Sequence, residues 1–144
     1  MEADEGSYVL DANVIMAILI SGKAYHREVL STIRCYSADF VYDEINTRKA
    51  VVQAKSKLSG SRFRQFVLDV FSRVTVAPAF IISDEDWQSV VELCKGIDVK
   101  DVAYVALSKA TGFPLVTRDK PLHTGLRRKG FRNVLLFDEF LDSL

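Results

Sequence analysis

Short hydrophobic runs alternate along the chain with stretches whose apolar residues recur at helical spacing. The runs predict five strands, at residues 8–10, 39–42, 74–77, 114–117 and 134–137. The stretches between them predict helices at residues 14–20, 25–36, 43–58, 62–73, 87–95, 100–110 and 121–129, with a short helix at the end. Strands that alternate with helices in this way predict parallel βαβ units.

Small and polar residues mark where these elements begin and end. Ser83 resembles a helix N-cap with Asp86 three residues later, and Gly96, Gly112 and Gly130 each follow a helical stretch. The segment 59–61 interrupts a helical region. Since no internal repeat, low-complexity tract or linker is present, we expect one α/β domain over residues 1–144.

The charge balance gives no global sign of a nucleic-acid partner, because 19 lysines and arginines offset 19 aspartates and glutamates. Basic residues nevertheless gather in two groups, which are either phosphate-binding surfaces or solvated helix faces. From these groups we select as candidate nucleic-acid-binding residues Arg48, Lys49, Arg118, Lys120, Arg127, Arg128 and Lys129.

The first twenty residues contain an apolar stretch that Asp11 and Asn13 interrupt. This stretch therefore predicts neither a signal peptide nor a membrane span. Cys35 and Cys94 lie far apart and outside any zinc-binding spacing, which favours buried free thiols. We expect a cytoplasmic location and no membrane partner.

Four segments place a carboxylate at a strand end or at a helix start. They are 10–13 with Asp11, 42–45 with Glu44, 97–101 with Asp98 and Asp101, and 116–119 with Asp119. In a parallel sheet the carboxyl ends of the strands share one edge, so these acids can meet in a single cleft. Their separation in sequence therefore says little against their proximity in space.

Three or four carboxylates cannot all stay ionised side by side unless cations neutralise them. Clusters of oxygen ligands suit Mg²⁺ or Mn²⁺. Two such ions about 4 Å apart can activate water and stabilise the departing oxygen of a phosphodiester. The constellation thus favours metal-dependent phosphodiester hydrolysis.

Over nearly the whole chain these segments resemble the PIN-domain nucleases, which include the toxin ribonucleases of prokaryotic toxin–antitoxin pairs. Val9-Leu10-Asp11-Ala12-Asn13 resembles the family's first strand and acid, and Glu44 its glutamate on an early helix. Asp101, before an alanine-containing apolar helix, resembles the third acid. Thr117-Arg118-Asp119 resembles the closing threonine and aspartate.

The resemblance implies a three-layer α/β/α sandwich around a mainly parallel sheet of about five strands. It also implies a Mg²⁺- or Mn²⁺-dependent endonuclease that acts usually on RNA rather than DNA. Asp11, Glu44, Asp101 and Asp119 would be both metal ligands and catalytic residues. The partner implied beside RNA is an antitoxin-like protein or a second copy of the chain. The neutral net charge departs from the pattern of a nucleic-acid-binding protein, while Asp43 and Asp98 leave the assignment of two ligands open.

Each candidate residue also has a structural interpretation. Asp11 can end a strand, Asn13 or Asp119 can cap a helix, and Glu44 can interact with a helix dipole. We expect Asn13 and Thr117 to orient ligands or waters from behind the ligand set. His26 and His123 are unaccompanied, so we interpret them as surface or core residues.

Other functions fit the pattern less well. A haloacid-dehalogenase-like phosphatase carries a second aspartate where this chain has Asn13, and a receiver-type signalling module needs an acid pair near its first strand. The alternative that remains open is a PIN-like module that binds nucleic acid or regulates a partner without turnover.

Overall fold

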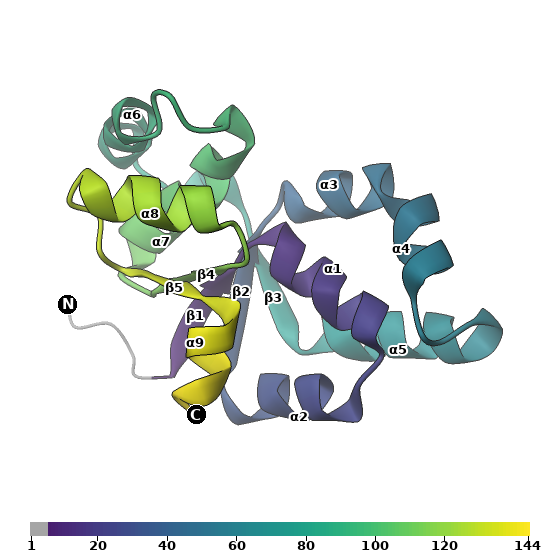
Figure 1. The fold of residues 1–144 in the computed structure, drawn as a ribbon. Coiled ribbons are helices and arrows are strands. Elements are labelled where there is room, and N and C mark those ends of the chain that lie inside the picture. The colour runs from purple at the N-terminus through teal and green to yellow at the C-terminus, as the bar shows by residue number, and fades with distance from the viewer. Residues whose placement is uncertain (1–5) are drawn as a thin grey trace.

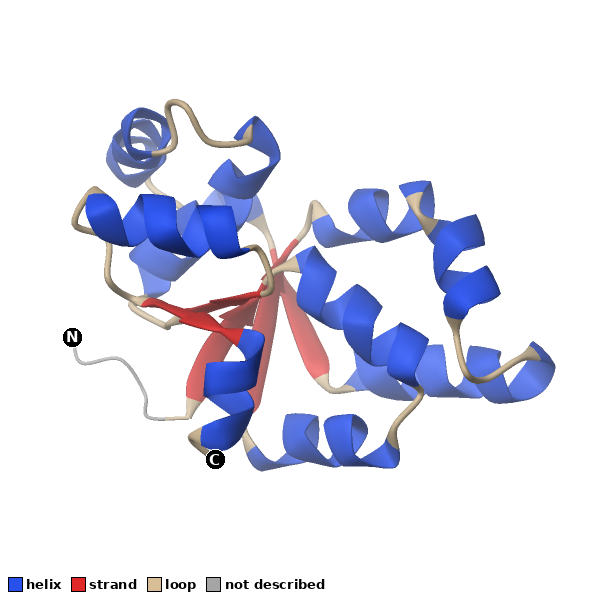
Figure 2. Cartoon of the chain, in the orientation of Figure 1, coloured by secondary structure: helices blue, strands red, loops and turns tan. Residues whose placement is uncertain are grey.

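The structure is a computed structural model that describes residues 6–144. Its centre is a sheet of five parallel strands in the order β3-β2-β1-β4-β5 (Figures 1 and 2). The strands are β1 (Ser7–Leu10), β2 (Arg34–Ala38), β3 (Val74–Ala77), β4 (Leu115–Thr117) and β5 (Val134–Leu136). The chain fills one side of β1 first and then crosses to the other, so the sheet has its switch point between β1 and β4.

Helices cover both faces of the sheet and complete an α/β/α sandwich. One face carries α1 (Ala12–Ser21), α2 (Ala24–Thr32), α5 (Gly60–Ser72) and α9 (Phe137–Asp142), with α3 (Val41–Thr47) and α4 (Lys49–Lys55) outside α1. The other face carries α6 (Asp84–Leu93), α7 (Val102–Thr111) and α8 (Lys120–Arg128). Two 3₁₀ turns, η1 (Ala79–Ile81) and η2 (Val99–Asp101), precede α6 and α7. The predicted fold class is confirmed.

Several predicted element boundaries agree with the structure because their local chemistry is decisive. The side chain of Ser83 accepts a hydrogen bond from the Asp86 amide at 3.0 Å and caps α6. Gly112 ends α7 at a φ of 78°, a conformation that glycine adopts without a steric penalty. The predicted third strand has the observed bounds Val74–Ala77.

The prediction for the second strand was wrong. Residues 34–38, expected to be largely helical, form β2, and residues 39–42 form a turn and the start of α3. Polar Arg34 and Ser37 resemble the outer face of a helix in sequence. In the fold Ser37 is buried, and its hydroxyl is satisfied by a 2.7 Å hydrogen bond to the Leu10 carbonyl. The long helix expected from residue 43 is also divided, because the chain turns at Arg48 between α3 and α4.

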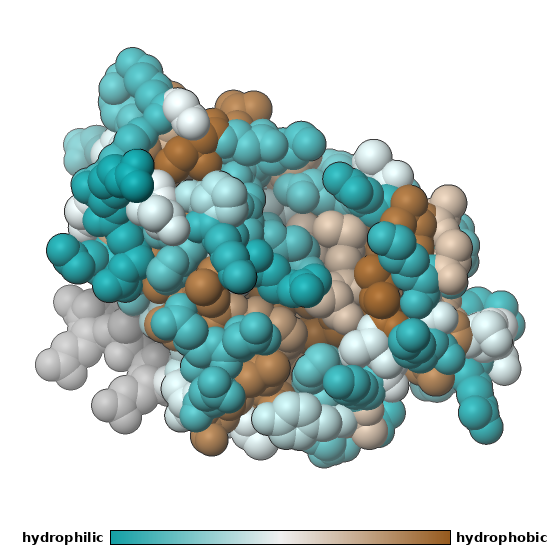
Figure 3. All heavy atoms as spheres, in the orientation of Figure 1, coloured by the Kyte–Doolittle hydropathy of each residue, from teal (hydrophilic) through white to brown (hydrophobic). Residues whose placement is uncertain are grey.

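The core lies between the sheet and both helical layers, and both cysteines are buried in it as free thiols, as predicted. Figure 3 shows one face of the molecule, largely hydrophilic, with hydrophobic side chains gathered over α4. Among residues 6–144, no helix is both long enough and apolar enough to cross a membrane.

Candidate active site

The predicted acids line one cleft of about 340 Å³ at the carboxyl ends of the strands. Asp11 follows β1 and Asp119 follows β4, on the two sides of the switch point. The carboxylates that line the cleft are Asp11, Asp43, Glu44, Asp98, Asp101 and Asp119. The cationic residues that line it are Arg48 and Lys100. The four segments chosen from sequence therefore meet, as the parallel topology requires.

A hydrogen-bond network fixes the Asp11 carboxylate between the ends of β1 and β4. The Thr117 hydroxyl donates to Asp11 Oδ2 at 2.9 Å, and the Asn13 side-chain amide donates to the Thr117 oxygen at 3.3 Å. Asn13 Oδ1 in turn accepts from the Arg118 backbone amide at 3.1 Å. Asn13 and Thr117 thus stand behind Asp11, in the places expected for residues that orient a ligand.

Burial and mutual repulsion make Asp11 and Asp101 hard to ionise. Burial raises the pKa of Asp11 to about 6; the Thr117 hydrogen bond opposes this shift, and the negative charge of Glu44 adds to it. Burial raises the pKa of Asp101 to about 7, and the carboxylates of Asp11 and Asp119 raise it further. A bound cation would offset both the burial of these carboxylates and their mutual repulsion, since it neutralises their charge where water cannot reach.

Asp98 and Asp119 both act as helix caps, the role considered for Asp119 in the sequence analysis. Asp119 Oδ1 accepts from the Leu122 amide at 3.0 Å at the start of α8. Asp98 Oδ1 accepts from the Lys100 amide at 3.1 Å at the start of η2. Asp98 is exposed, whereas Asp101 is buried at the start of α7. Asp101 is therefore better placed than Asp98 to meet a ligand inside the cleft.

Glu44 has a neighbour that the sequence did not single out. Tyr104, fully buried on α7, interacts through its hydroxyl with the Glu44 carboxylate. The hydroxyl and Glu44 Oε1 are both buried, yet their geometry falls short of a full hydrogen bond. Tyr104 looked like one more member of the apolar series after Asp101. The one signal in the sequence was a tyrosine three residues after Asp101, because the phenol of a buried tyrosine needs a polar partner.

Of the predicted basic residues, Arg48 alone is among those that line the cleft. Arg48 lines it, whereas Lys49 lines a separate hollow. Lys129 donates to the Leu93 carbonyl at 2.8 Å and to the Lys95 carbonyl, a structural role at the end of α6. Arg127 and Arg128 are exposed in the last turn of α8, where cations favour the helix dipole. Exposed Arg118 and Lys120 flank Asp119 in sequence, and Lys100 is a cleft cation that sequence reasoning missed.

The residues fit a divalent cation by their chemistry. All the acidic donors are oxygens, which suit Mg²⁺ or Mn²⁺, and Glu44 Oε1 is a buried oxygen without a hydrogen-bond partner. Within residues 6–144, no three His, Cys, Asp or Glu side chains form a ready-made ligand group. Direct ligation by Asp11, Glu44, Asp101 and Asp119 therefore stays a prediction.

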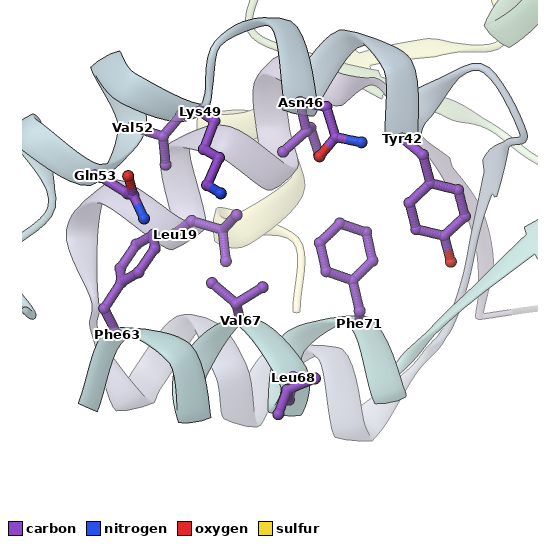
Figure 4. Close-up of a pocket in the computed structure, with 11 residues that line it drawn as sticks. Leu19, Tyr42, Asn46, Lys49, Val52, Gln53, Phe63, Val67, Leu68 and Phe71 are labelled. Atoms are coloured by element: carbon purple, nitrogen blue, oxygen red, sulfur yellow. The ribbon is translucent and has the colours of Figure 1, made fainter. Parts of the chain in front are cut away.

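A second hollow, of about 420 Å³, lies between α3 and α4 on one side and α5 on the other (Figure 4). Val67 and Phe71 of α5 point into it opposite Leu19 and Asn46. Its lining is mostly apolar and contains no carboxylate.

The fold and the cleft define an α/β domain with carboxylates at the switch point of a parallel sheet. A family model described as "PIN domain" matches residues 9–137. The chain belongs to the PIN-domain family, whose members are generally metal-dependent nucleases. None of the curated proteins matches the sequence.

The fold is shared by solved structures, among them the following two. The crystal structure of PAE2754 from Pyrobaculum aerophilum superposes with a TM-score of 0.65 at 16% identity, over 96% of this chain and 92% of that one. A toxin–antitoxin complex from Klebsiella pneumoniae superposes with a TM-score of 0.57 at 17% identity, over 89% and 95%.

Proposed function

We propose that this protein is a Mg²⁺- or Mn²⁺-dependent endonuclease that hydrolyses phosphodiester bonds in RNA. The observation that carries the proposal is the acid-lined cleft of a PIN-domain chain, in which Asp11 and Asp101 are buried against each other's charge. Buried carboxylates that destabilise the unliganded fold are characteristic of functional sites rather than of structural ones.

The position of each residue in the cleft suggests its role. Asp11, Glu44, Asp101 and Asp119 would hold the ions, with Asp98 at the rim. Bound Mg²⁺ or Mn²⁺ would supply an activated water and neutralise charge on the phosphate. Thr117 and Asn13 hold the Asp11 carboxylate in one orientation.

Two cations can contact the substrate's phosphates. The side chains of Arg48 and Lys100 line the same cleft as the acids, so a backbone phosphate entering it passes them. They offset part of the negative potential that would otherwise repel a polyanion.

Cleavage of mixed single-stranded RNA and DNA oligonucleotides tests the proposal. The protein should cleave RNA with Mg²⁺ or Mn²⁺ and not with EDTA, and Asp11→Asn should remove the activity. Asp142→Asn is the matched control, since Asp142 is an exposed acid on α9 that does not line the cleft. Binding of RNA without metal-dependent cleavage would instead support the alternative, a PIN-like binding or regulatory module.

We also propose, as a biological setting, that the chain is the toxin of a toxin–antitoxin pair. The support is the likeness of its fold to a structure described as a toxin–antitoxin complex. Induced expression should arrest growth of a bacterial host, and Asp11→Asn should relieve the arrest. Equal growth with the two proteins would exclude a toxin whose effect depends on this site.

A further inference from the structure

A third hollow, of about 520 Å³, adjoins the acidic cleft. It lies between Phe40, which precedes α3, the helix α6 and the start of α7. The residues that give it its apolar character are Phe40, Trp87, Val91, Ile97, Val99 and Val102. We call it the Phe40–Trp87 hollow.

The Phe40–Trp87 hollow lies directly beside the cleft. Phe40 and Lys100 line both spaces, so the two share one wall. Phe40 is 36% exposed and Val99 79% exposed, which leaves apolar surface open beside a row of carboxylates. Its volume is that of a small-molecule pocket, roughly 300–1,000 Å³.

We propose that the Phe40–Trp87 hollow binds one unpaired nucleobase of a single-stranded nucleic acid whose backbone crosses the acidic cleft. The inference rests on the proposed function and names its substrate class. Every base has a π-face that stacks on aromatic side chains, whatever its sequence. A base inside a duplex is already stacked and paired, so it cannot enter the hollow without leaving the helix.

The charges beside the hollow favour a nucleotide over an apolar peptide. The shared wall leads from apolar surface to Lys100 and then to a cleft prepared for cations and phosphate. A nucleotide has the same sequence of chemistry, with an apolar base attached to a charged backbone. An apolar protein segment would instead end against the carboxylates, which offer it no partner.

The chain contains its own reporter for this test, because Trp87 is its single tryptophan. Asp11→Asn protein is used because it should not cleave the RNA. It is titrated with a single-stranded RNA 12-mer and with the same sequence as a duplex. Affinity is measured by fluorescence anisotropy of the labelled strand, and Trp87 emission is followed in the same samples. Phe40→Ala is compared with Tyr25→Ala, which removes an exposed aromatic ring on α2 that does not line the hollow.

The single strand should quench Trp87 emission, and Phe40→Ala should weaken its binding about tenfold or more while duplex binding stays unchanged. Tyr25→Ala should change neither. Unaltered Trp87 emission together with equal single-strand affinity in Phe40→Ala would overturn the proposal. So would a change in oligomeric state in Phe40→Ala with no change in RNA affinity, which would make the hollow a protein interface.

The same variants separate this inference from the proposed function. If the natural chain cleaves RNA and Phe40→Ala cleaves it with an unchanged Michaelis constant, the nuclease activity is supported and the base site is refuted. The opposite result is also distinguishable. If the single strand quenches Trp87 and Phe40→Ala loses affinity, but the natural chain cleaves no RNA, the base site is supported and the nuclease activity is refuted.

Discussion

Replacing Asp11 by asparagine should stabilise the metal-free protein at pH 8, although it should destroy the site. Burial raises the pKa of Asp11 from 3.8 to about 6, so ionising this carboxyl costs the folded state roughly 3 kcal/mol. Asparagine is neutral, has nearly the same shape and can still accept the Thr117 hydrogen bond. Because it replaces only part of the carboxylate's interactions, 3 kcal/mol is an upper value for the gain.

The sign follows from the two pKa values. Between about pH 4 and pH 6 the folded state holds a proton on Asp11 that the unfolded chain has lost, so the stability of the natural protein falls as the pH rises. Asp101, whose pKa is about 7, extends that loss to neutral pH. The advantage of Asp11→Asn should therefore be small near pH 4 and largest above pH 7.

Thermal unfolding in EDTA at pH 4.5, 6 and 8 measures this effect. At 2–4 °C per kcal/mol for a domain of this size, the variant should melt up to roughly 10 °C higher at pH 8. Mg²⁺ at a hundredfold excess over its dissociation constant should add about 2.7 kcal/mol to the natural protein and little to the variant, which cancels most of the variant's advantage. Asp142→Asn, which changes an exposed acid outside the cleft, should follow the natural protein. A lower melting temperature for Asp11→Asn than for the natural chain at pH 8 in EDTA would refute the reasoning.

Three further predictions concern neighbouring residues. Single-turnover cleavage with Mn²⁺ should fall roughly a thousandfold in Asp101→Asn, a loss of about 4 kcal/mol, and much less in Asp98→Asn; the opposite ranking would reverse the assignment. Arg48→Gln should lower the slope of log affinity for RNA against log salt by about one, whereas an unchanged slope after neutralising residues 127–129 would exclude that run from the interface. Tyr104→Phe should weaken Mg²⁺ binding in calorimetry, because it removes the hydroxyl that interacts with the Glu44 carboxylate. It should not lower metal-free stability, because that buried hydroxyl lacks a full hydrogen bond. Unaltered Mg²⁺ affinity would leave Tyr104 a purely structural residue.

The sequence predicts the fold well wherever one local signal dominates. The apolar run of β3 and the glycine after α7 have no competing interpretation, and both agree with the structure. The β2 segment failed because its strand character comes from its neighbours. Cys35 is paired in register with Tyr8 on one side and Val74 on the other, and Ser37 is satisfied only by the Leu10 carbonyl. Such tertiary contacts outweigh local propensity and cannot be read from a window of sequence.

The candidate site could be predicted for a different reason. Parallel topology brings every strand's carboxyl end to one edge, which places Asp11 after β1 beside Asp119 after β4. Glu44 and Asp101, which lie near the starts of helices, were found through the family resemblance. Side chains that reach the site from other parts of the fold could not be predicted in this way. Tyr104 reaches Glu44 from inside an apolar helix, and Phe40 and Lys100 become neighbours only through the packing of α3 beside η2.

The hydrogen bond between Thr117 and Asp11 spans 106 residues, and β1 pairs on one side with β2, which follows it closely in the chain, and on the other with the distant β4. During synthesis the first acid exists long before Thr117 and Asp119 leave the ribosome. Until these two residues are available the chain cannot close its cleft, however stable its first half is. The order of synthesis thus separates the formation of the first half of the sheet from the completion of the acidic cleft.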